Sequence, residues 1–174
     1  DKLRRGLKMN NIKINFLSAV KTFAAVVVIG FSIGKAQGVF ITEIADPGND
    51  TGARFVELYN SGSTDIDLGA GGYKVQRWTN GNPNPTASSI KDLTGVIPAG
   101  GFYILAPGDG SAFQSTYGFA ANQGIGNGGA ADSNGDDQIA ITNSTGDILD
   151  IFGVPGEDGT GTAHDFADGR AERV

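Results

Sequence analysis

Short apolar runs separated by clusters of turn residues dominate the chain after residue 37, and this pattern leaves room for strands but for almost no helix. The runs are rich in β-branched and aromatic residues, which favour strands. Between them, NGNPNPTAS at 80–88 contains prolines, which lack the amide donor that a strand interior needs. The 28 glycines of the 174-residue chain suit a backbone that turns often. The clearest strands are expected at 39–45, 54–60, 72–79, 102–106, 137–143 and 148–153.

A weaker strand is expected at 89–95 and a closing strand at 169–174, whereas the Gly- and Asn-rich stretch 108–135 offers only a short helix near 111–117. About eight short strands predict an all-β fold, an antiparallel β-sandwich of about 7–9 strands. A parallel α/β sheet is disfavoured because no gap between the runs contains a convincing crossover helix. A β-barrel is the alternative architecture.

The first 37 residues follow a different pattern, which is typical of a secretory signal peptide. After Met9, two lysines form a basic part ahead of an apolar run at 22–33. Gly34 and Ala36 are small residues at the −3 and −1 positions of a cut after Ala36. The apolar run of about a dozen residues is short for a bilayer-spanning helix, which needs about 20.

We therefore expect residues 1–37 to comprise upstream residues plus a signal peptide helix, and residues 38–174 to form one folded domain. The domain would then be secreted, periplasmic or at the cell surface, with no stable membrane span once the signal is cleaved. An uncleaved membrane anchor or a buried first helix is the alternative for the apolar run.

The net charge of −6 hides an asymmetry between the two parts of the chain. The first 37 residues hold seven of the 13 Lys and Arg but one of the 19 Asp and Glu, so residues 38–174 carry six basic and 18 acidic residues, a net charge of −12. Such a body repels polyanions, so direct nucleic-acid binding is not expected. It would need a calcium bridge or a basic patch built from Arg54, Lys74, Arg77 and Lys91.

The lack of cysteine excludes disulfides and thiolate metal sites, and the single histidine, His164, excludes sites that need two imidazoles. Carboxylates are therefore the main candidates for chemistry. The stretch around Glu157, Asp158, His164, Asp165 and Asp168 could bind a metal or supply a general base. An exposed acidic loop is the alternative.

Glu43 and Glu57 stand inside two otherwise apolar strands. Strand alternation places each glutamate on the same face as apolar neighbours, and a buried unpaired carboxylate is costly. The two could form a catalytic pair, as in glycosidases. We favour structural ion pairs with Arg170 or Arg173 of the closing strand, and we predict no catalytic residue.

Residues 131–138, ADSNGDDQ, contain the strongest candidate for a metal site. Oxygen ligands recur at alternate positions, as in calcium loops. The stretch departs from an EF-hand, which needs Gly at its sixth position and Glu at its twelfth, and a polar turn is the alternative. The expected calcium ligands are Asp132, Asn134, Asp136 and Asp137.

Arg77 and Trp78 precede the two-proline loop and form a candidate ligand platform. An exposed tryptophan at such a place could stack on a carbohydrate. The alternative is that Trp78 is an ordinary core aromatic.

FITEIA, FVELYNSGSTDIDLGAGGYKV, VIPAGGFYILAPGD, DDQIAITNSTGDILDIFG and GRAERV occur in this order over residues 39–174. Together they resemble the lamin tail domain in its secreted bacterial form. The resemblance implies an immunoglobulin-like sandwich, which agrees with the strand pattern. It also implies a non-catalytic binding or adhesion module, which in this family is often attached to a secreted or surface enzyme such as a nuclease. The insert 108–135 and the loop 80–88 depart from the family pattern.

The expected function is thus a secreted, non-enzymatic binding, adhesion or accessory module, with no cofactor other than calcium. Its expected partner is an extracellular protein, a polysaccharide or an attached enzyme domain. Two alternatives stay open: an accessory domain of a larger secreted nuclease or hydrolase, and a metal-dependent hydrolase that uses the acidic loops.

Overall fold

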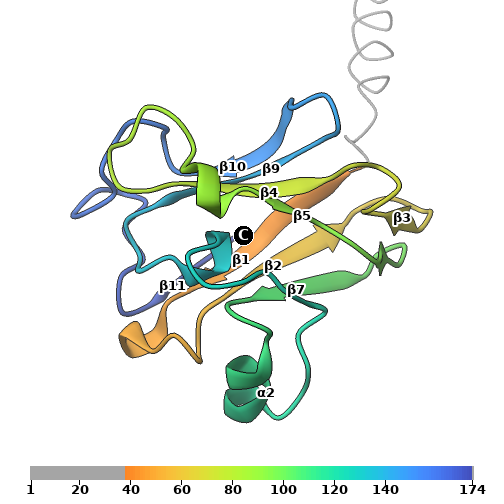
Figure 1. Cartoon of the computed structure of the whole chain (residues 1–174), viewed down its shortest axis with the longest axis horizontal. Coiled ribbons are helices and arrows are strands. Elements are labelled where there is room, and N and C mark those ends of the chain that lie inside the picture. The colour runs from red at the N-terminus through yellow and green to blue at the C-terminus, as the bar shows by residue number, and fades with distance from the viewer. Residues whose placement is uncertain (1–37, 174) are drawn as a thin grey trace, which may run out of the picture. The chain divides into compact units, whose positions relative to one another are not determined.

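The apolar runs pair into two larger sheets that lie over one another, with a small third sheet at one side (Figure 1). The computed structural model describes residues 38–173. The first sheet has the order β11-β1-β2-β7-β8, with bounds Arg170–Glu172, Val39–Ala45, Phe55–Asn60, Phe102–Ala106 and Gln123–Gly124. The second has the order β10-β9-β4-β5, with bounds Ile148–Phe152, Gln138–Thr142, Lys74–Trp78 and Lys91–Asp92. The third pairs β3 (Ile66–Asp67) with β6 (Val96–Ile97).

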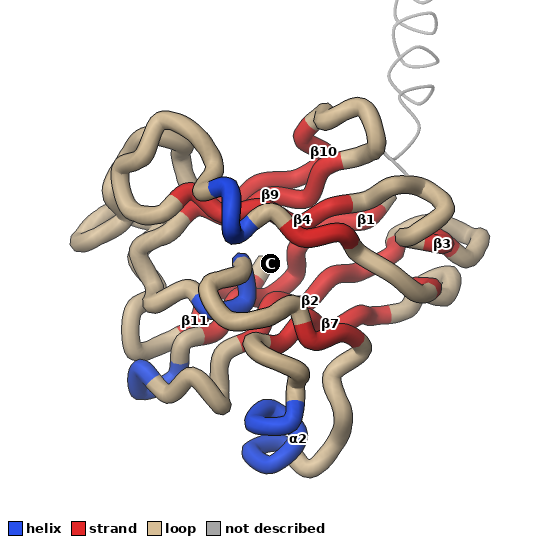
Figure 2. Tube along the Cα trace, in the orientation of Figure 1, coloured by secondary structure: helices blue, strands red, loops and turns tan. Residues whose placement is uncertain are grey.

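Loops and turns, rather than helices, connect most of these strands (Figure 2). Within the described residues the helical elements are α2 (Ser111–Tyr117) and three short 3-10 turns, η1 (Pro47–Asn49), η2 (Ala87–Ser89) and η3 (Ala130–Asp132). The strand pairs are antiparallel except for β7 with β8, which is parallel. This arrangement confirms the immunoglobulin-like antiparallel β-sandwich. Among residues 38–173 the structure has no helix with the length and apolar character that a membrane crossing requires.

The core lies between the facing sheets and follows from strand alternation. In β2, Val56, Leu58 and Asn60 are buried, whereas Phe55, Glu57 and Tyr59 lie half-buried on the outer face. In β9 every residue is buried, because the strand lies between β10 and β4 and is covered on both faces. Such burial of apolar side chains from both sheets is the main source of stability.

A β-bulge in β1 changes which face Glu43 occupies. The pairing of β1 with β2 shifts register between Ile41 and Glu43. The bulge adds one residue, so Val39, Ile41 and Ile44 are buried and Glu43 falls on the outer face. The expectation that Glu43 shares a face with Val39 and Ile41 is therefore wrong, because simple alternation does not hold through a bulge.

Asn60 ties the end of β2 to the small third sheet. Its side chain is fully buried, and its Nδ2 donates to the carbonyl oxygens of Thr64 at 2.8 Å, Ile97 at 3.1 Å and Pro98 at 3.1 Å. Its Oδ1 accepts from the amide of Gly62 at 2.8 Å. Asn60 thus satisfies backbone groups that this turn-rich region leaves without strand partners.

The strands at 39–45 and 102–106 and the helix at 111–117 agree with the sequence prediction. β6 and β8 were not expected, because two-residue strands carry no alternation signal. Residues Gln37–Val174 form one compact unit. The predicted signal peptide lies outside the described residues.

Replacing Asn60 by Asp should destabilise the domain by about 3 kcal/mol or more. The carboxylate would face three carbonyl oxygens and lose the donor that they share. Chemical denaturation at pH 7 measures the effect, and Asn134→Asp at an exposed position is the matched control. Equal stability of the two variants would contradict the role given to Asn60.

Candidate functional site

The outer face of the first sheet carries a row of three aromatic side chains, one from each of β1, β2 and β7. Strand register places Phe40 opposite Tyr59 and Tyr59 opposite Phe102. The ring centroids of Phe40 and Tyr59 are 5.5 Å apart, and those of Tyr59 and Phe102 are 4.8 Å apart. Phe102 is 55% exposed; it begins β7, and β8 pairs with β7 only at Leu105 and Ala106. We call this surface the aromatic face (Phe40, Tyr59 and Phe102, with Thr42, Gly100 and Arg173 at its rim).

The aromatic face forms an open, shallow pocket of about 430 Å³. This volume is within the range of ligand sites, about 300–1,000 Å³. Its lining combines apolar rings with a hydroxyl and a guanidinium group, which is the composition that binding sites share. The surface can therefore bind a ligand without any covalent chemistry.

Arg173 forms one end of the aromatic face and is held in place from three sides. Its guanidinium lies over the ring of Phe40, 5.3 Å from the centroid. Its Nε donates to the carbonyl oxygen of Ile41 at 2.8 Å, and its Nη2 donates to both carboxylate oxygens of Asp150 at 2.8 and 2.7 Å. Asp150 in turn accepts from the amide of Ile41 at 2.8 Å. These side chains satisfy the backbone of β1 where β11 no longer pairs with it.

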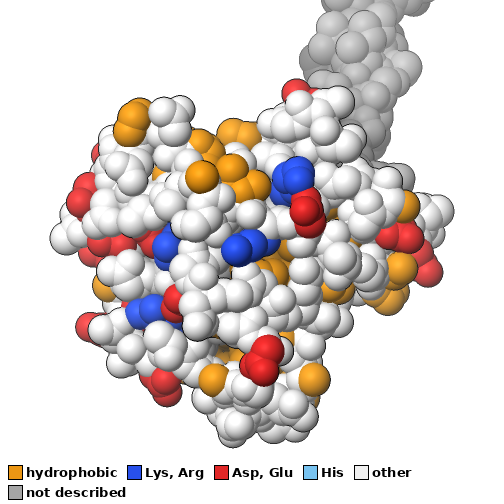
Figure 3. All heavy atoms as spheres, in the orientation of Figure 1, with side chains coloured by type: hydrophobic (Ala, Val, Ile, Leu, Met, Phe, Trp, Pro, Cys, Tyr) orange, Lys and Arg blue, Asp and Glu red, His pale blue; other side chains and the backbone are white. Residues whose placement is uncertain are grey.

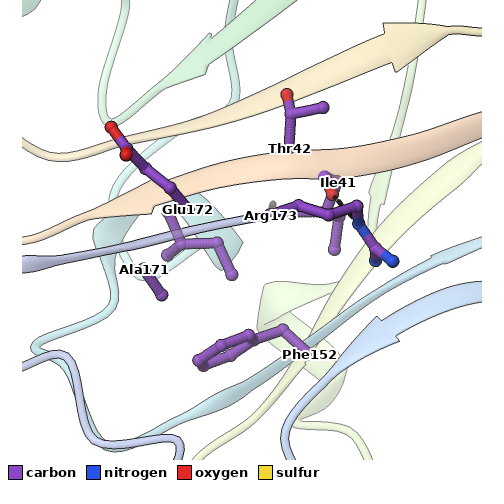
Figure 4. Close-up of a pocket in the computed structure, with 7 residues that line it drawn as sticks. Ile41, Thr42, Phe152, Ala171, Glu172 and Arg173 are labelled. Carbon is purple, nitrogen blue, oxygen red and sulfur yellow. Dashed lines mark hydrogen bonds between the residues drawn. The ribbon is translucent and has the colours of Figure 1, made fainter.

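A smaller apolar pocket of about 150 Å³ lies on the other side of β1 and β11 (Figure 4). Ile41 and Ala171 point toward Phe152, whereas Thr42 and Glu172 point away from it, and the guanidinium of Arg173 lies beside β1. This pocket belongs to the edge of the sandwich core.

Three carboxylates lie side by side beyond the aromatic row, because register pairs Glu43 with both Glu172 and Glu57. Arg170 reaches two of them, with Nη1 3.5 Å from Glu43 Oε1 and Nη2 3.0 Å from Glu172 Oε1. Thr42 Oγ1 donates to Glu57 Oε1 at 2.7 Å. Burial raises the pKa of Glu43; Arg170 opposes this shift, and Glu172 and Glu57 add to it.

Of the ion pairs expected between Glu43 or Glu57 and Arg170 or Arg173, the structure contains the one between Glu43 and Arg170, whereas Arg173 pairs with a different carboxylate. Arg170 lies beside Glu43, as the hypothesis of structural ion pairs required. Arg173 binds Asp150 instead of Glu57, because its side chain crosses to the edge strand β10. The partner of Glu57 is the hydroxyl of Thr42 on the neighbouring strand.

A buried network of arginine and aspartate side chains holds the long insert against both sheets. Arg54, the residue before β2, is 7% exposed; its Nε lies 2.6 Å from Asp46 Oδ1 and its Nη1 lies 3.0 Å from Asp132 Oδ1. Arg77 in β4 donates from Nη1 to the carbonyl oxygen of Asp132 at 2.9 Å. Its Nη1 also lies 3.1 Å from Oδ2 of the fully buried Asp137. Burial alone would lower the pKa of Arg54, but hydrogen bonds to Asp46 and Asp132 outweigh it and raise the pKa.

The four expected calcium ligands do not converge in this arrangement. Asp132 and Asp137 contact arginines, Asn134 is exposed, and Asp136 accepts from Asn80 Nδ2 at 3.1 Å. Burial and the neighbouring Asp137 raise the pKa of Asp136. Within residues 38–173 no group of three or more His, Cys, Asp or Glu is placed to hold a metal ion. Calcium binding at this loop stays a prediction without a supporting geometry.

The expected ligand platform at Arg77 and Trp78 is wrong, because the structure buries both residues. Trp78 is 4% exposed, and Arg77 is 9% exposed. Their strand lies inside the second sheet between β9 and β5, and the guanidinium of Arg77 binds the insert. Among the described residues, the exposed aromatic rings are Phe102 on the first sheet and Tyr117 and Phe119 at the end of α2.

The basic patch considered for nucleic acid is not formed either. Arg54 and Arg77 are buried, and Lys74 forms an ion pair with Asp92. In the view of Figure 3, the basic side chains are separate spots rather than one continuous surface.

The acidic stretch near the C-terminal end uses its carboxylates to build turns. Hydrogen bonds from Thr160 hold the pKa of Asp158 below its usual value, and the amides of Gly161 and Ala167 do the same for Asp165. His164 lies with Nδ1 3.1 Å from the hydroxyl of Thr162. This stretch shows local turn chemistry, as the alternative of an acidic loop predicted.

Sequence reasoning did not identify the aromatic face, because no motif distinguishes Phe40, Tyr59 and Phe102 from the other aromatic residues of the strands. The available signal was alternation in RFVELYN, which places Phe55, Glu57 and Tyr59 on one face. It leaves open which face is the inner one. The pairing of three distant strands then decides which rings become neighbours.

These features define an immunoglobulin-like β-sandwich with an aromatic sheet face and, among residues 38–173, no group of carboxylates and histidine placed to hold a metal ion. The family model of the Lamin Tail Domain matches residues 34–156. The chain belongs to this family. The match runs from before β1 to beyond β10, and β11 with Arg170 and Arg173 lies after it. No curated protein matches the chain.

Replacing Arg54 by Met should destabilise the domain by about 3–5 kcal/mol, because Asp46 and Asp132 would lose their charged partner in a buried place. The control is Lys74→Met, which removes an ion pair whose two side chains are 41% and 78% exposed and should cost less than about 1 kcal/mol. Urea unfolding measures both. Equal losses would show that the buried network is not what holds the insert.

Glu43→Gln should gain stability relative to the wild-type chain as the pH rises from about 4 to about 7. The folded state binds the proton of Glu43 more tightly than the unfolded chain does, so ionisation above the usual pKa costs the wild type stability. The gain should stay below about 1 kcal/mol, because Arg170 and solvent screen the charge. Thermal melts of both chains across this pH range measure the difference. If the variant loses stability relative to the wild-type chain as the pH rises, the direction given for the pKa of Glu43 is wrong.

Proposed function

We propose that this domain is a secreted, non-catalytic binding or adhesion module, and that the aromatic face is its binding surface. The observation that carries the proposal is the exposure of Phe102 beside Tyr59 and Phe40, in a shallow pocket that no element of the described chain covers. Exposed aromatic rings grouped on one sheet face are costly unless a partner uses them. Membership of the lamin tail domain family agrees with a module of this kind.

Secretion is supported by the pattern of residues 9–36, a basic part, an apolar run and small residues before a cut. A module that acts outside the cell needs a target that lies there too. An extracellular polymer, a surface protein or an attached enzyme domain would satisfy this. The same module could serve as the accessory domain of a larger secreted nuclease or hydrolase, since binding by the aromatic face would hold an attached enzyme near its substrate.

Hydrolysis by the acidic loops is the less favoured function, because the carboxylates of these loops are already engaged in ion pairs and hydrogen bonds within the domain. Asp132 and Asp137 neutralise buried arginines, and Asp158 and Asp165 accept hydrogen bonds from turn amides. A metal-dependent hydrolase would need carboxylates with free oxygens around one point. Turnover of a substrate that stops on chelation and in Asp136→Asn would overturn the proposal of a non-catalytic module.

The full chain should sediment with envelope fragments of the cells that produce it, and Phe102→Ala should weaken this binding about tenfold. Phe102 is 55% exposed, so its removal leaves the core intact. The matched control is Phe119→Ala, which removes a ring that is 54% exposed but lies on the α2 side, against Phe113. Binding that is lost equally in both variants, or in neither, would contradict the assignment of the aromatic face.

A further inference from the structure

We infer that the aromatic face binds an uncharged polysaccharide chain. The inference rests on the proposed function, because it names the ligand class of the same surface. It goes beyond that function by choosing among a protein, a glycan and an attached domain. Four features of the face support the choice: its rings, its polar rim, its length and its charge.

The rings offer the surface that a sugar ring needs. The flat faces of sugars carry C–H groups with partial positive charge, and the faces of aromatic rings carry partial negative charge. Phe40, Tyr59 and Phe102 follow one another across three strands, with centroids 5.5 and 4.8 Å apart. The ring planes are inclined to one another by 66° and 43°, and the guanidinium of Arg173 lies over Phe40, so Phe102 offers the largest exposed ring surface. The open pocket suits a chain of sugars better than one small molecule, which prefers an enclosed cavity.

The polar groups at the rim match the hydroxyl groups of sugars, which both donate and accept hydrogen bonds. Next to the rim, Glu57 lies two residues before Tyr59 on the same face of β2; one of its oxygens accepts from Thr42, and the other can accept from a ligand. Arg173 supplies charge-assisted donors and is fixed in place by Asp150. The groups are therefore preorganised, which lowers the entropy cost of binding.

The face is long enough for more than one sugar unit. The row of rings crosses three strands about 4.8 Å apart and therefore extends over about 10 Å, whereas Phe55, Glu57 and Tyr59 share the outer face along β2. At the far end, Phe55 contacts Phe113 and Tyr117 of α2, with ring centroids 5.8 and 5.7 Å apart. Phe55 therefore packs against α2, and the surface open to a sugar chain is the aromatic row with Glu57 beside it.

The negative charge of the domain disfavours an acidic polymer as the ligand. The cost of removing water from the carboxylates beside the rings disfavours a protein. Residues 38–174 carry a net charge of −12, and Glu43, Glu57 and Glu172 lie beside the rings. A polyanion would be repelled. A typical protein partner would cover about 800 Å² on this side and would strip water from the three carboxylates at high cost. A glycan leaves such groups hydrated or bridged by water.

The first test uses uncharged polysaccharides directly. The full chain is mixed with microcrystalline cellulose, chitin, β-1,3-glucan and starch, with alginate as the acidic control, and the bound fraction is measured. At least one uncharged polymer should retain the chain, with about tenfold weaker binding by Phe102→Ala and Tyr59→Ala and unchanged binding by Phe119→Ala. Binding to alginate as tight as to the uncharged polymers would overturn the inference.

The second test separates this inference from the proposed function. Envelope fragments of the producing cells are treated either with protease or with periodate, which cleaves sugars that carry neighbouring hydroxyls. Binding that survives protease supports a glycan ligand, and its loss after periodate then indicates a polymer with neighbouring hydroxyls, such as cellulose or starch. Chitin and β-1,3-glucan lack such hydroxyls within the chain, so binding to them should survive both treatments. Binding that is lost after protease and survives periodate overturns the glycan and leaves the binding module intact. Failure to bind untreated fragments removes the proposed function and the inference together.

Discussion

The pairing of two buried arginines with Asp132 is the interaction on which the rest of the sandwich depends. Arg54 approaches from the first sheet and holds the carboxylate of Asp132 at 3.0 Å, whereas Arg77 approaches from the second and binds its carbonyl oxygen at 2.9 Å. One residue of the insert thereby links both sheets, and η3 packs against β2, β4 and β7. A buried charge needs a partner of opposite sign. Asp132 therefore serves to stabilise the fold, and we assign it no role in catalysis or metal binding.

The strand pattern could be predicted because alternation and turn residues are local properties of the sequence. β1, β7 and α2 agree with the expected bounds, since their apolar spacing and flanking glycines act over a few residues. The bulge in β1 could not be predicted, because it depends on the pairing with β2. Its effect is large for the site, since it moves Glu43 from the inner face to the outer one.

The candidate site was harder to predict than the fold, because its members meet only through distant pairings. The single tryptophan, Trp78, attracted attention as an exposed ring, yet a central strand buries it. Tyr59 and Phe102 have no special motif, and strand register alone makes them neighbours. Arg54 and Asp132 lie 78 residues apart in sequence, so no local pattern shows that the acidic loop neutralises arginines instead of binding a cation.

The account therefore divides the domain into a structural loop and a functional sheet face. The most direct test is hydroxyl-radical footprinting of the full chain, free and bound to envelope fragments of the producing cells. The account predicts that binding reduces oxidation of Phe102 and Tyr59 and leaves Phe119 unchanged. Unchanged oxidation of Phe102, with protection appearing at 132–137 instead, would contradict it and return the function to the acidic loop.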